Sequence, residues 1–138
     1  MSGGEYQLHP IGWVRSPLVS VAASPRQGDE GAPDAELVFA GEFVQGLKDL
    51  HAGDTIWVLT WLDRARRDVL VVHPRDDVTR PQQGVFSTRS ADRPNPVGLH
   101  HVEIMSIDGS TVRVRSLEAI DGTPIIDVKP TLGPASER

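Results

Sequence analysis

HVEIMSIDGSTVRVRSL, residues 101–117, is the most informative segment of the chain for its fold. Apolar and polar residues alternate on both sides of Asp108-Gly109, a pattern typical of two half-buried antiparallel strands. An Asp-Gly pair readily adopts the positive φ angles of a tight primed turn. We therefore predict a β-hairpin whose first strand covers 97–107 and whose turn is Asp108-Gly109.

Most of the remaining chain also reads as short strands. The run TIWVLTWL at 55–62 is rich in β-branched and aromatic residues, so it predicts a strand buried on both faces. Only residues 42–50 place apolar side chains at helical spacing, which predicts one short helix. Further strands are predicted at 6–14, 36–39, 69–73, 84–87 and 124–128, and a long loop at 15–33. This order predicts a mainly β protein, a single-domain β-barrel with one short helix and long loops.

Length and composition limit the classes of function. The 138 residues fit one domain over 1–138, with a core at about 6–130, and the chain contains no cysteine. A disulfide framework, a thiolate nucleophile and a cysteine-ligated metal are therefore excluded. Acidic residues outnumber basic ones by 19 to 14, which argues against binding nucleic acid through broad electrostatic attraction. No signal peptide or membrane span is evident, so we expect a soluble cytoplasmic protein.

Two segments concentrate polar and rigid residues. In GVFSTRSADRPNPVGL, residues 84–99, prolines restrict Arg93 and Asn95 to extended geometry, which suits either a preorganised site or a stiff crossover corner. In DGTPIIDVK, residues 121–129, a carboxylate, a glycine and a hydroxyl lie together. They suit either a polyhydroxylated ligand or an ordinary tight turn before the next strand. The residues alone leave both alternatives open.

Three blocks together resemble the TsaA/TrmO family, whose members are also described as YaeB-like. The blocks are IGWVRSP at 11–17 with Pro25-Arg26-Gln27, GVFSTRSADRPNPVGL at 84–99, and DGTPIIDVKP at 121–130. They follow the family's order and cover nearly the whole chain. The resemblance implies a β-barrel-like domain that binds S-adenosylmethionine and works as a homodimer. It also implies methylation of the exocyclic nitrogen of threonylcarbamoyladenosine beside the tRNA anticodon.

The resemblance further implies which residues bind the cofactor. An arginine can clamp the methionine carboxylate, an aspartate can accept from ribose hydroxyls, and a leucine can pack on adenine. After the 55–62 strand the family has a His-Gln pair that contributes to the cofactor site, and this chain has Asp63-Arg64 there. The cofactor-site candidates are Pro25, Arg26, Gln27, Asp63, Arg64, Arg89, Leu99, Asp121, Gly122, Thr123 and Pro124. Because only TLGPASER follows DVKP, we expect a short form without the C-terminal extension of longer members.

The charged and imidazole side chains leave further alternatives open. Five arginines form either a basic lip for a phosphate-bearing substrate or a solvated face. They are Arg64, Arg66, Arg67, Arg75 and Arg80. His100 and His101 point to opposite faces of a strand and cannot readily share one ion, so no metal site is predicted. His73 is either a substrate-side acid or base or a structural hydrogen-bonding group.

The function also has alternatives. No GxGxxG motif opens a helix after a strand, so a dinucleotide-type methyltransferase fold is not expected. Transfer from a sulfonium is an in-line displacement that depends on alignment, so no catalytic base is assigned. The leading interpretation is a methyltransferase acting on tRNA. The alternatives are methylation of a small molecule, which fits the short acidic chain, and a non-catalytic module that binds S-adenosylmethionine or a nucleotide.

Overall fold

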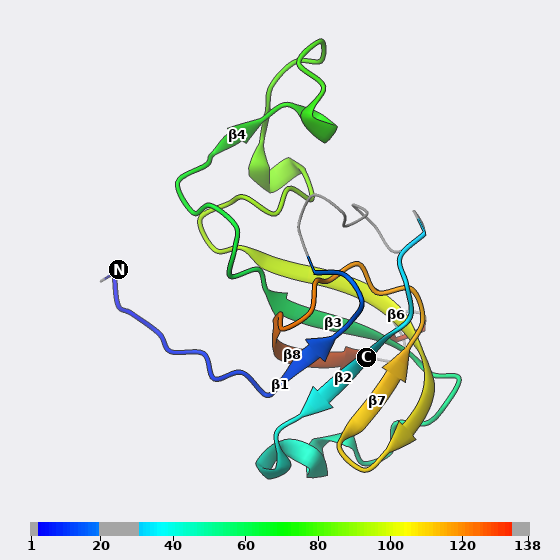
Figure 1. Cartoon of the computed structure of the whole chain (residues 1–138). Helices are drawn as coiled ribbons and strands as arrows, with labels where there is room; N and C mark the ends of the chain where they lie inside the picture. The colour runs from blue at the N-terminus through cyan, green and yellow to red at the C-terminus, as the bar shows by residue number, and fades with distance from the viewer. Residues whose placement is uncertain (1–2, 20–30, 134–138) are drawn as a thin grey trace.

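The computed structural model describes residues 3–19 and 31–133, and its main sheet is a closed barrel (Figure 1). Antiparallel strands follow one another around the ring in the order β1-β2-β7-β6-β3-β8. Their bounds are Gly12–Arg15 (β1), Ala35–Phe39 (β2), Thr55–Trp61 (β3), Val97–Asp108 (β6), Thr111–Val114 (β7) and Pro124–Pro130 (β8). The mainly β, barrel-like fold expected from the sequence is therefore confirmed.

The barrel interior is filled by alternate residues of each strand. In β2, Ala35, Leu37 and Phe39 are buried while the residues between them are half-buried. The same period of two recurs in β7, where Val112 and Val114 are buried. Because alternate side chains of a strand point to opposite faces, each strand contributes one apolar row to a shared core.

The predicted hairpin forms between β6 and β7, but its turn lies one residue later than expected. Asp108 ends β6 and pairs with Thr111, so the loop consists of Gly109 and Ser110. Gly109 has a φ of 60° and is the loop residue with a positive φ, whereas Asp108 keeps a strand conformation. A two-residue loop with glycine first matches the type II′ turn. This register gives the positive φ to the residue without a Cβ.

The first predicted strand is shorter than the sequence indicates. The prediction of a strand over 6–14 is wrong at its start, because β1 begins at Gly12 and residues 3–10 are exposed. Pro10 has no N–H to donate to a neighbouring strand. Hydrogen bonding to the sheet therefore begins at Ile11, whose N–H donates to Ile125 O at 2.8 Å. Gly12 permits a close approach, since a Cβ there would lie 2.5 Å from Val38 O.

The predicted short helix is present, and the predicted burial of the 55–62 strand needs correction. The segment at 42–50 forms a 3₁₀ helix, η3 (Gly41–Leu47), whose two glycines disfavour a regular α-helix. The segment at 55–62 forms β3, which buries one face while Trp57, Leu59 and Trp61 on the other face stay half-exposed. Among the described residues no helix is long and apolar enough to cross a membrane.

Between β3 and β6 the chain leaves the barrel and forms an arm, residues 62–96, at the top of Figure 1. The arm begins and ends at one place, because Leu62 N donates to Pro96 O at 2.8 Å directly after the last β3–β6 pair. It contains β4 (Val71–Val72), η4 (Pro74–Asp76), β5 (Gln83–Gly84) and η5 (Val85–Ser87). The strands predicted at 69–73 and 84–87 are thus reduced to a two-residue pairing, and most of the second segment is the 3₁₀ turn η5.

Candidate functional site

The Asp121-Gly122 turn is fastened to the chain that leaves β1. Asp121 N donates to Leu18 O at 2.6 Å, and Gly122 N donates to Val14 O at 2.7 Å. In the opposite direction, Ser16 N donates to Asp121 Oδ1 at 3.0 Å. Gly122 has a φ of 84°, which residues with a Cβ rarely adopt, so the turn depends on glycine. The first and third blocks of the sequence are therefore joined in one hydrogen-bonded unit.

Thr123 and Pro124 continue this turn into the barrel. Thr123 is 2% exposed, and its hydroxyl donates to Ile120 O at 2.7 Å. Pro124 begins β8 opposite Trp13 of β1. The Thr123 hydroxyl therefore already has its hydrogen-bond partner within the turn, whereas the Asp121 side chain is accessible to solvent.

Arg64 contacts the segment after β1 as well. Its Nη1 donates to Val19 O at 3.3 Å. Asp63 N donates to Trp61 O at 2.9 Å, and this tight turn leaves both Asp63 and Arg64 exposed. Asp121 and Arg64 thus both contact residues 16–19, which precede Pro25-Arg26-Gln27. Those three candidates lie outside the described residues.

Arg93 organises the loop of the second block. Its guanidinium donates to Ser90 O at 2.9 Å and to Thr88 O at 2.7 Å, and also to Val85 O. Val85 is itself 1% exposed. A planar guanidinium has five donors and can hold several carbonyls at once. Arg93 is therefore committed to shaping the loop that carries Arg89.

Arg67 holds the proline-rich run from the other side. Its Nε donates to Pro94 O at 2.6 Å and its Nη2 to Asn95 Oδ1 at 2.8 Å. The guanidinium carbon also lies 5.2 Å from the ring centroid of Trp61, within cation–π range. These contacts add to the stiffness that the prolines impose on their neighbours.

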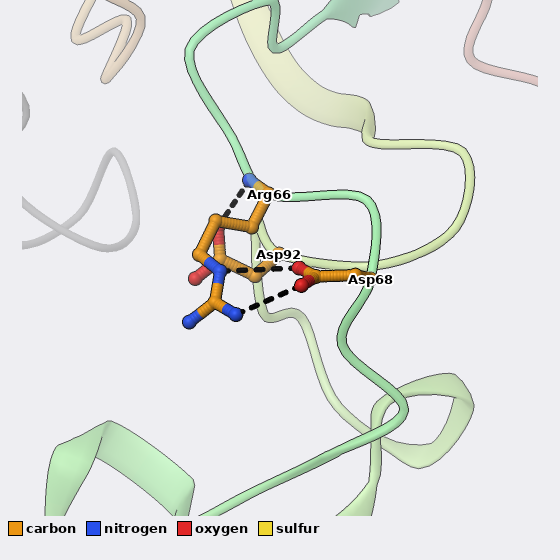
Figure 2. Close-up of polar contacts among 3 residues, drawn as sticks. All are labelled: Arg66, Asp68 and Asp92. Atoms are coloured by element: carbon orange, nitrogen blue, oxygen red, sulfur yellow. Dashed lines mark hydrogen bonds and ion pairs between the residues drawn. The ribbon is translucent and has the colours of Figure 1, made fainter.

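Arg66 links its own stretch to Asp92 and Arg93 through its backbone, while its side chain pairs locally with Asp68 (Figure 2). Arg66 N donates to Asp92 Oδ1 at 2.8 Å, and Arg93 N donates to Arg66 O at 3.0 Å. The guanidinium forms a two-bond pair with Asp68, at 3.1 and 3.0 Å. This hydrogen bonding lowers the pKa of the Asp68 carboxyl below its usual value and raises the pKa of Arg66.

Arg89 and Leu99 are the accessible candidates of the second block. Arg89 is exposed, and within 3–19 and 31–133 its side chain makes no hydrogen bond or ion pair. Leu99 lies on β6 opposite Leu59 of β3 and is 41% exposed. A ligand could engage both groups without breaking an existing contact.

The structure also shows which contacts the other arginines and the histidines make. Of the five arginines considered as a basic lip, Arg64, Arg66 and Arg67 make the contacts described above. His73 Nδ1 lies 2.8 Å from Arg80 O. Of the two roles considered for His73, this contact matches the structural hydrogen bond. His100 is buried and His101 is exposed, so the two imidazoles do occupy opposite faces. In the part of the chain that the structure describes, no group of three His, Cys, Asp or Glu side chains could hold a metal.

Two features of the site are not predicted from the sequence. The sequence leaves the roles of the arginines in the run DRARRD at 63–68 open, because nothing local reveals that the partners of Arg67 lie 27 and 28 residues away. A largely buried polar cluster of Thr60, His100 and Glu118 is also missed. Its signal is a threonine and a histidine at inward positions of otherwise apolar strands.

Comparisons with known proteins identify relatives that match nearly the whole of this chain. A probable S-adenosyl-L-methionine-binding protein of Methanothermobacter thermautotrophicus is 43% identical over 130 residues, which cover 94% of this chain and 93% of the relative. Another, of Archaeoglobus fulgidus, is 44% identical over 90% of this chain. The crystal structure of TrmO from Pseudomonas aeruginosa matches with a TM-score of 0.75 and 26% identity over 99% of this chain.

The relatives differ in length. The chain spans 33% of the Archaeoglobus protein and 61% of the Pseudomonas TrmO chain. The match to a family description is nevertheless nearly complete for this chain, because the tRNA-methyltransferase O N-terminal domain matches residues 13–135. The three sequence blocks, the barrel and the relatives agree, and the chain belongs to the tRNA-methyltransferase O N-terminal domain family.

Proposed function

We propose that the chain binds S-adenosylmethionine where the Asp121-Gly122 turn and Arg64 meet residues 16–19. One observation carries the proposal: both groups contact the segment that precedes Pro25-Arg26-Gln27, so candidates from distant parts of the sequence converge on one stretch of chain. The relatives from Methanothermobacter and Archaeoglobus are described as probable binding proteins for this ligand, which supports the same assignment.

The available side chains fit the parts of this cofactor. Arg89 offers a guanidinium that has no partner among the described residues, which suits a carboxylate. Asp121 is exposed and accepts Ser16 N at Oδ1, which leaves acceptor capacity for ribose hydroxyls. Leu99 offers apolar surface that suits adenine.

We further propose that the protein is a methyltransferase. The bound cofactor supplies a methyl group on a positively charged sulfonium. The chain then has to orient the acceptor in line with that group, and rigid elements do this best. Arg67 and Arg93 supply that rigidity by fixing the loop around Arg89. The exposed Asp121 carboxylate would favour a nearby positive centre.

The acceptor that we propose is the exocyclic nitrogen of threonylcarbamoyladenosine in tRNA. Membership of a tRNA-methyltransferase family supports a tRNA acceptor. The charge distribution is also compatible with it, because residues 63–93 carry seven arginines and five aspartates although the whole chain has a net charge of −5. A positive surface on the arm would attract phosphates locally. A tRNA acceptor would place the protein in the cytoplasm.

A second candidate function retains binding of S-adenosylmethionine but not methylation of tRNA. The chain covers 93% of the Methanothermobacter binding protein but 61% of the Pseudomonas TrmO chain. Relatives of about the same length are therefore named for binding rather than for methylation. Methylation of a small molecule, or binding without turnover, are the corresponding alternatives.

We also propose that the protein works as a homodimer. The arm exposes large apolar side chains, among them Phe86 at 82% and Val78 at 78%. Large exposed apolar side chains concentrated in one segment of a chain commonly mark a protein contact surface. Light scattering after size exclusion would test this, since a monomeric mass at assay concentration contradicts the proposal.

The cofactor proposal is tested by isothermal titration with S-adenosylmethionine, S-adenosylhomocysteine and, as a control, ATP. We expect saturable binding of the first two and none of ATP. Absence of heat with all three would overturn the assignment. The acceptor is then tested by transfer of a labelled methyl group to tRNA that carries threonylcarbamoyladenosine, with tRNA lacking this modification as the matched control. Binding of the cofactor with no transfer to either tRNA would favour the second candidate function.

A further inference from the structure

A chain of hydrogen bonds runs through two buried side chains, Thr60 and His100, to the partly buried Glu118. His100 Nε2 lies 2.7 Å from Thr60 Oγ1, and His100 Nδ1 lies 2.5 Å from Glu118 Oε1. Thr60 is fully buried and His100 is 5% exposed, while the side chain of Glu118 is 14% exposed. Burying such groups is costly unless each finds a partner, so the three residues depend on one another.

Gly98 makes room for this chain of hydrogen bonds. It pairs with Thr60 across β3 and β6. A Cβ at position 98 would lie 2.3 Å from Thr60 Oγ1 and 2.7 Å from His100 Nε2. The absence of a side chain at position 98 therefore leaves space for the Thr60–His100 hydrogen bond instead of apolar packing.

The order hydroxyl, imidazole and carboxylate resembles a nucleophilic triad, but the burial excludes that role. A nucleophile has to reach a substrate atom, and Thr60 has no exposed surface. The groups therefore act on the protein itself. What they can do is fix the relative positions of the three segments that carry them.

Two of these segments also carry a candidate cofactor residue, and the third, β3, ends two residues before Asp63. His100 directly follows Leu99 on β6, and Glu118 precedes Asp121 by three residues in the connector between β7 and β8. Thr60 lies near the end of β3, where the β3–β8 register shifts between Leu59 and Thr60. A register shift is a place where strand pairing alone fixes the geometry less firmly.

We infer that Glu118, His100 and Thr60 form a positioning network that holds the Asp121-Gly122 turn in place relative to Leu99. The cofactor site is then formed before the ligand binds. This inference rests on the proposed function, because it concerns the same cofactor site. The three side chains are largely buried and bonded to one another, so each is a positioning residue.

Thr60→Val and Glu118→Gln test the network, because both keep the volume of the side chain. We expect each to weaken binding of S-adenosylmethionine by roughly three- to tenfold, the range for one lost hydrogen bond. Thr60→Ser keeps the hydroxyl and should bind within about twofold of the wild type. Ile104→Val is the control, since it changes a fully buried residue of β6 that lies outside the network.

Amide hydrogen exchange gives a second measurement that needs no ligand. The N–H groups of Asp121 and Gly122 are hydrogen-bonded in the turn. They should exchange faster in Thr60→Val and Glu118→Gln and at the wild-type rate in Ile104→Val. If the network variants lose thermal stability while the ligand affinity and these exchange rates stay at wild-type values, the inference is wrong. If the wild type itself does not bind S-adenosylmethionine, the proposed function fails, and the exchange rates still report on the network.

Discussion

Arg67 and Asn95 are joined by a 2.8 Å hydrogen bond from the guanidinium to the side-chain oxygen, across 28 residues of sequence. This contact ties together the two stretches where the arm leaves the barrel and where it returns. It also shows how the Arg93-Pro94-Asn95-Pro96 run is held. The prolines limit its backbone freedom, and Arg67 fixes its position.

Replacement of Arg67 by alanine should therefore destabilise the arm. The variant loses two hydrogen bonds and a cation–π contact at an exposed site, so we expect a cost of about 1 kcal/mol. For a chain of this length that corresponds to a decrease in Tm of roughly 3–6 °C. Arg115→Ala is the control, because its pair with Glu103 is long, at 3.5 Å, and exposed. Equal Tm values for the two variants would show that the Arg67 contacts add no stability.

Arg89→Ala should behave in the opposite way. Arg89 has no internal partner within the described residues, so its removal should leave the Tm within about 1 °C of the wild type. If Arg89 binds the carboxylate of the cofactor, a charge-assisted hydrogen bond worth roughly 1.5–3 kcal/mol is lost, or about 10- to 150-fold in affinity. Isothermal titration measures the affinity. A folded Arg89→Ala protein with wild-type affinity removes Arg89 from the cofactor site.

Gly98→Ala tests whether the space beside Thr60 and His100 is needed. The added methyl group would lie within 2.7 Å of polar atoms of both residues, so one hydrogen bond has to shift. We expect a loss of about 1–3 kcal/mol in the free energy of unfolding, measured by urea denaturation. Gly46→Ala is the matched control, because a Cβ at position 46 meets nothing within 4 Å. Equal effects of the two substitutions would contradict the close packing at Gly98.

The Arg15–Glu36 ion pair predicts a dependence of stability on acidic pH. Its hydrogen bond of 2.8 Å lowers the pKa of Glu36 below the usual value of 4.5. The native state then binds fewer protons than the unfolded state, so this contribution is present above pH 4.5 and is lost as the pH falls through the lowered pKa. Melting curves of Glu36→Gln between pH 6 and pH 3 should show a shallower decline in Tm than the wild type. Arg15→Ala removes the cause of the shift and should flatten the curve in the same way, and curves parallel to the wild type would refute the assignment.

Much of the fold is predictable because alternation of apolar and polar residues is a local property. It identifies β6 and β7 and also β2, whose Leu37 and Phe39 alternate with half-buried residues. The errors lie where local pattern does not decide the structure. Whether strand pairing continues before Ile11 depends on Pro10 and on the neighbouring strands, and a shift of one residue in the hairpin turn follows from where glycine is most needed.

The site is only partly predictable for the same reason. The Asp121-Gly122 turn is evident from its dipeptide, but its hydrogen bonds to Ser16 and Leu18 come from the other end of the chain. The roles of Arg67 and Arg93 in shaping the second block cannot be read from charge alone, since an arginine that holds carbonyls looks like one that faces solvent. The Thr60–His100 contact similarly depends on strand register.

The hydrogen bond between Leu62 and Pro96 also bears on how this protein could change over evolution. Because the chain leaves and re-enters the barrel at neighbouring residues, the arm is an insertion into a β-hairpin. Insertions with adjacent ends are well tolerated, since a short loop can close the same gap at little entropic cost. The outer part of the arm, around β4, η4 and β5 and between Arg64 and Arg89, can therefore be lengthened, shortened or exchanged between homologues while the barrel and the Asp121 turn keep their structure.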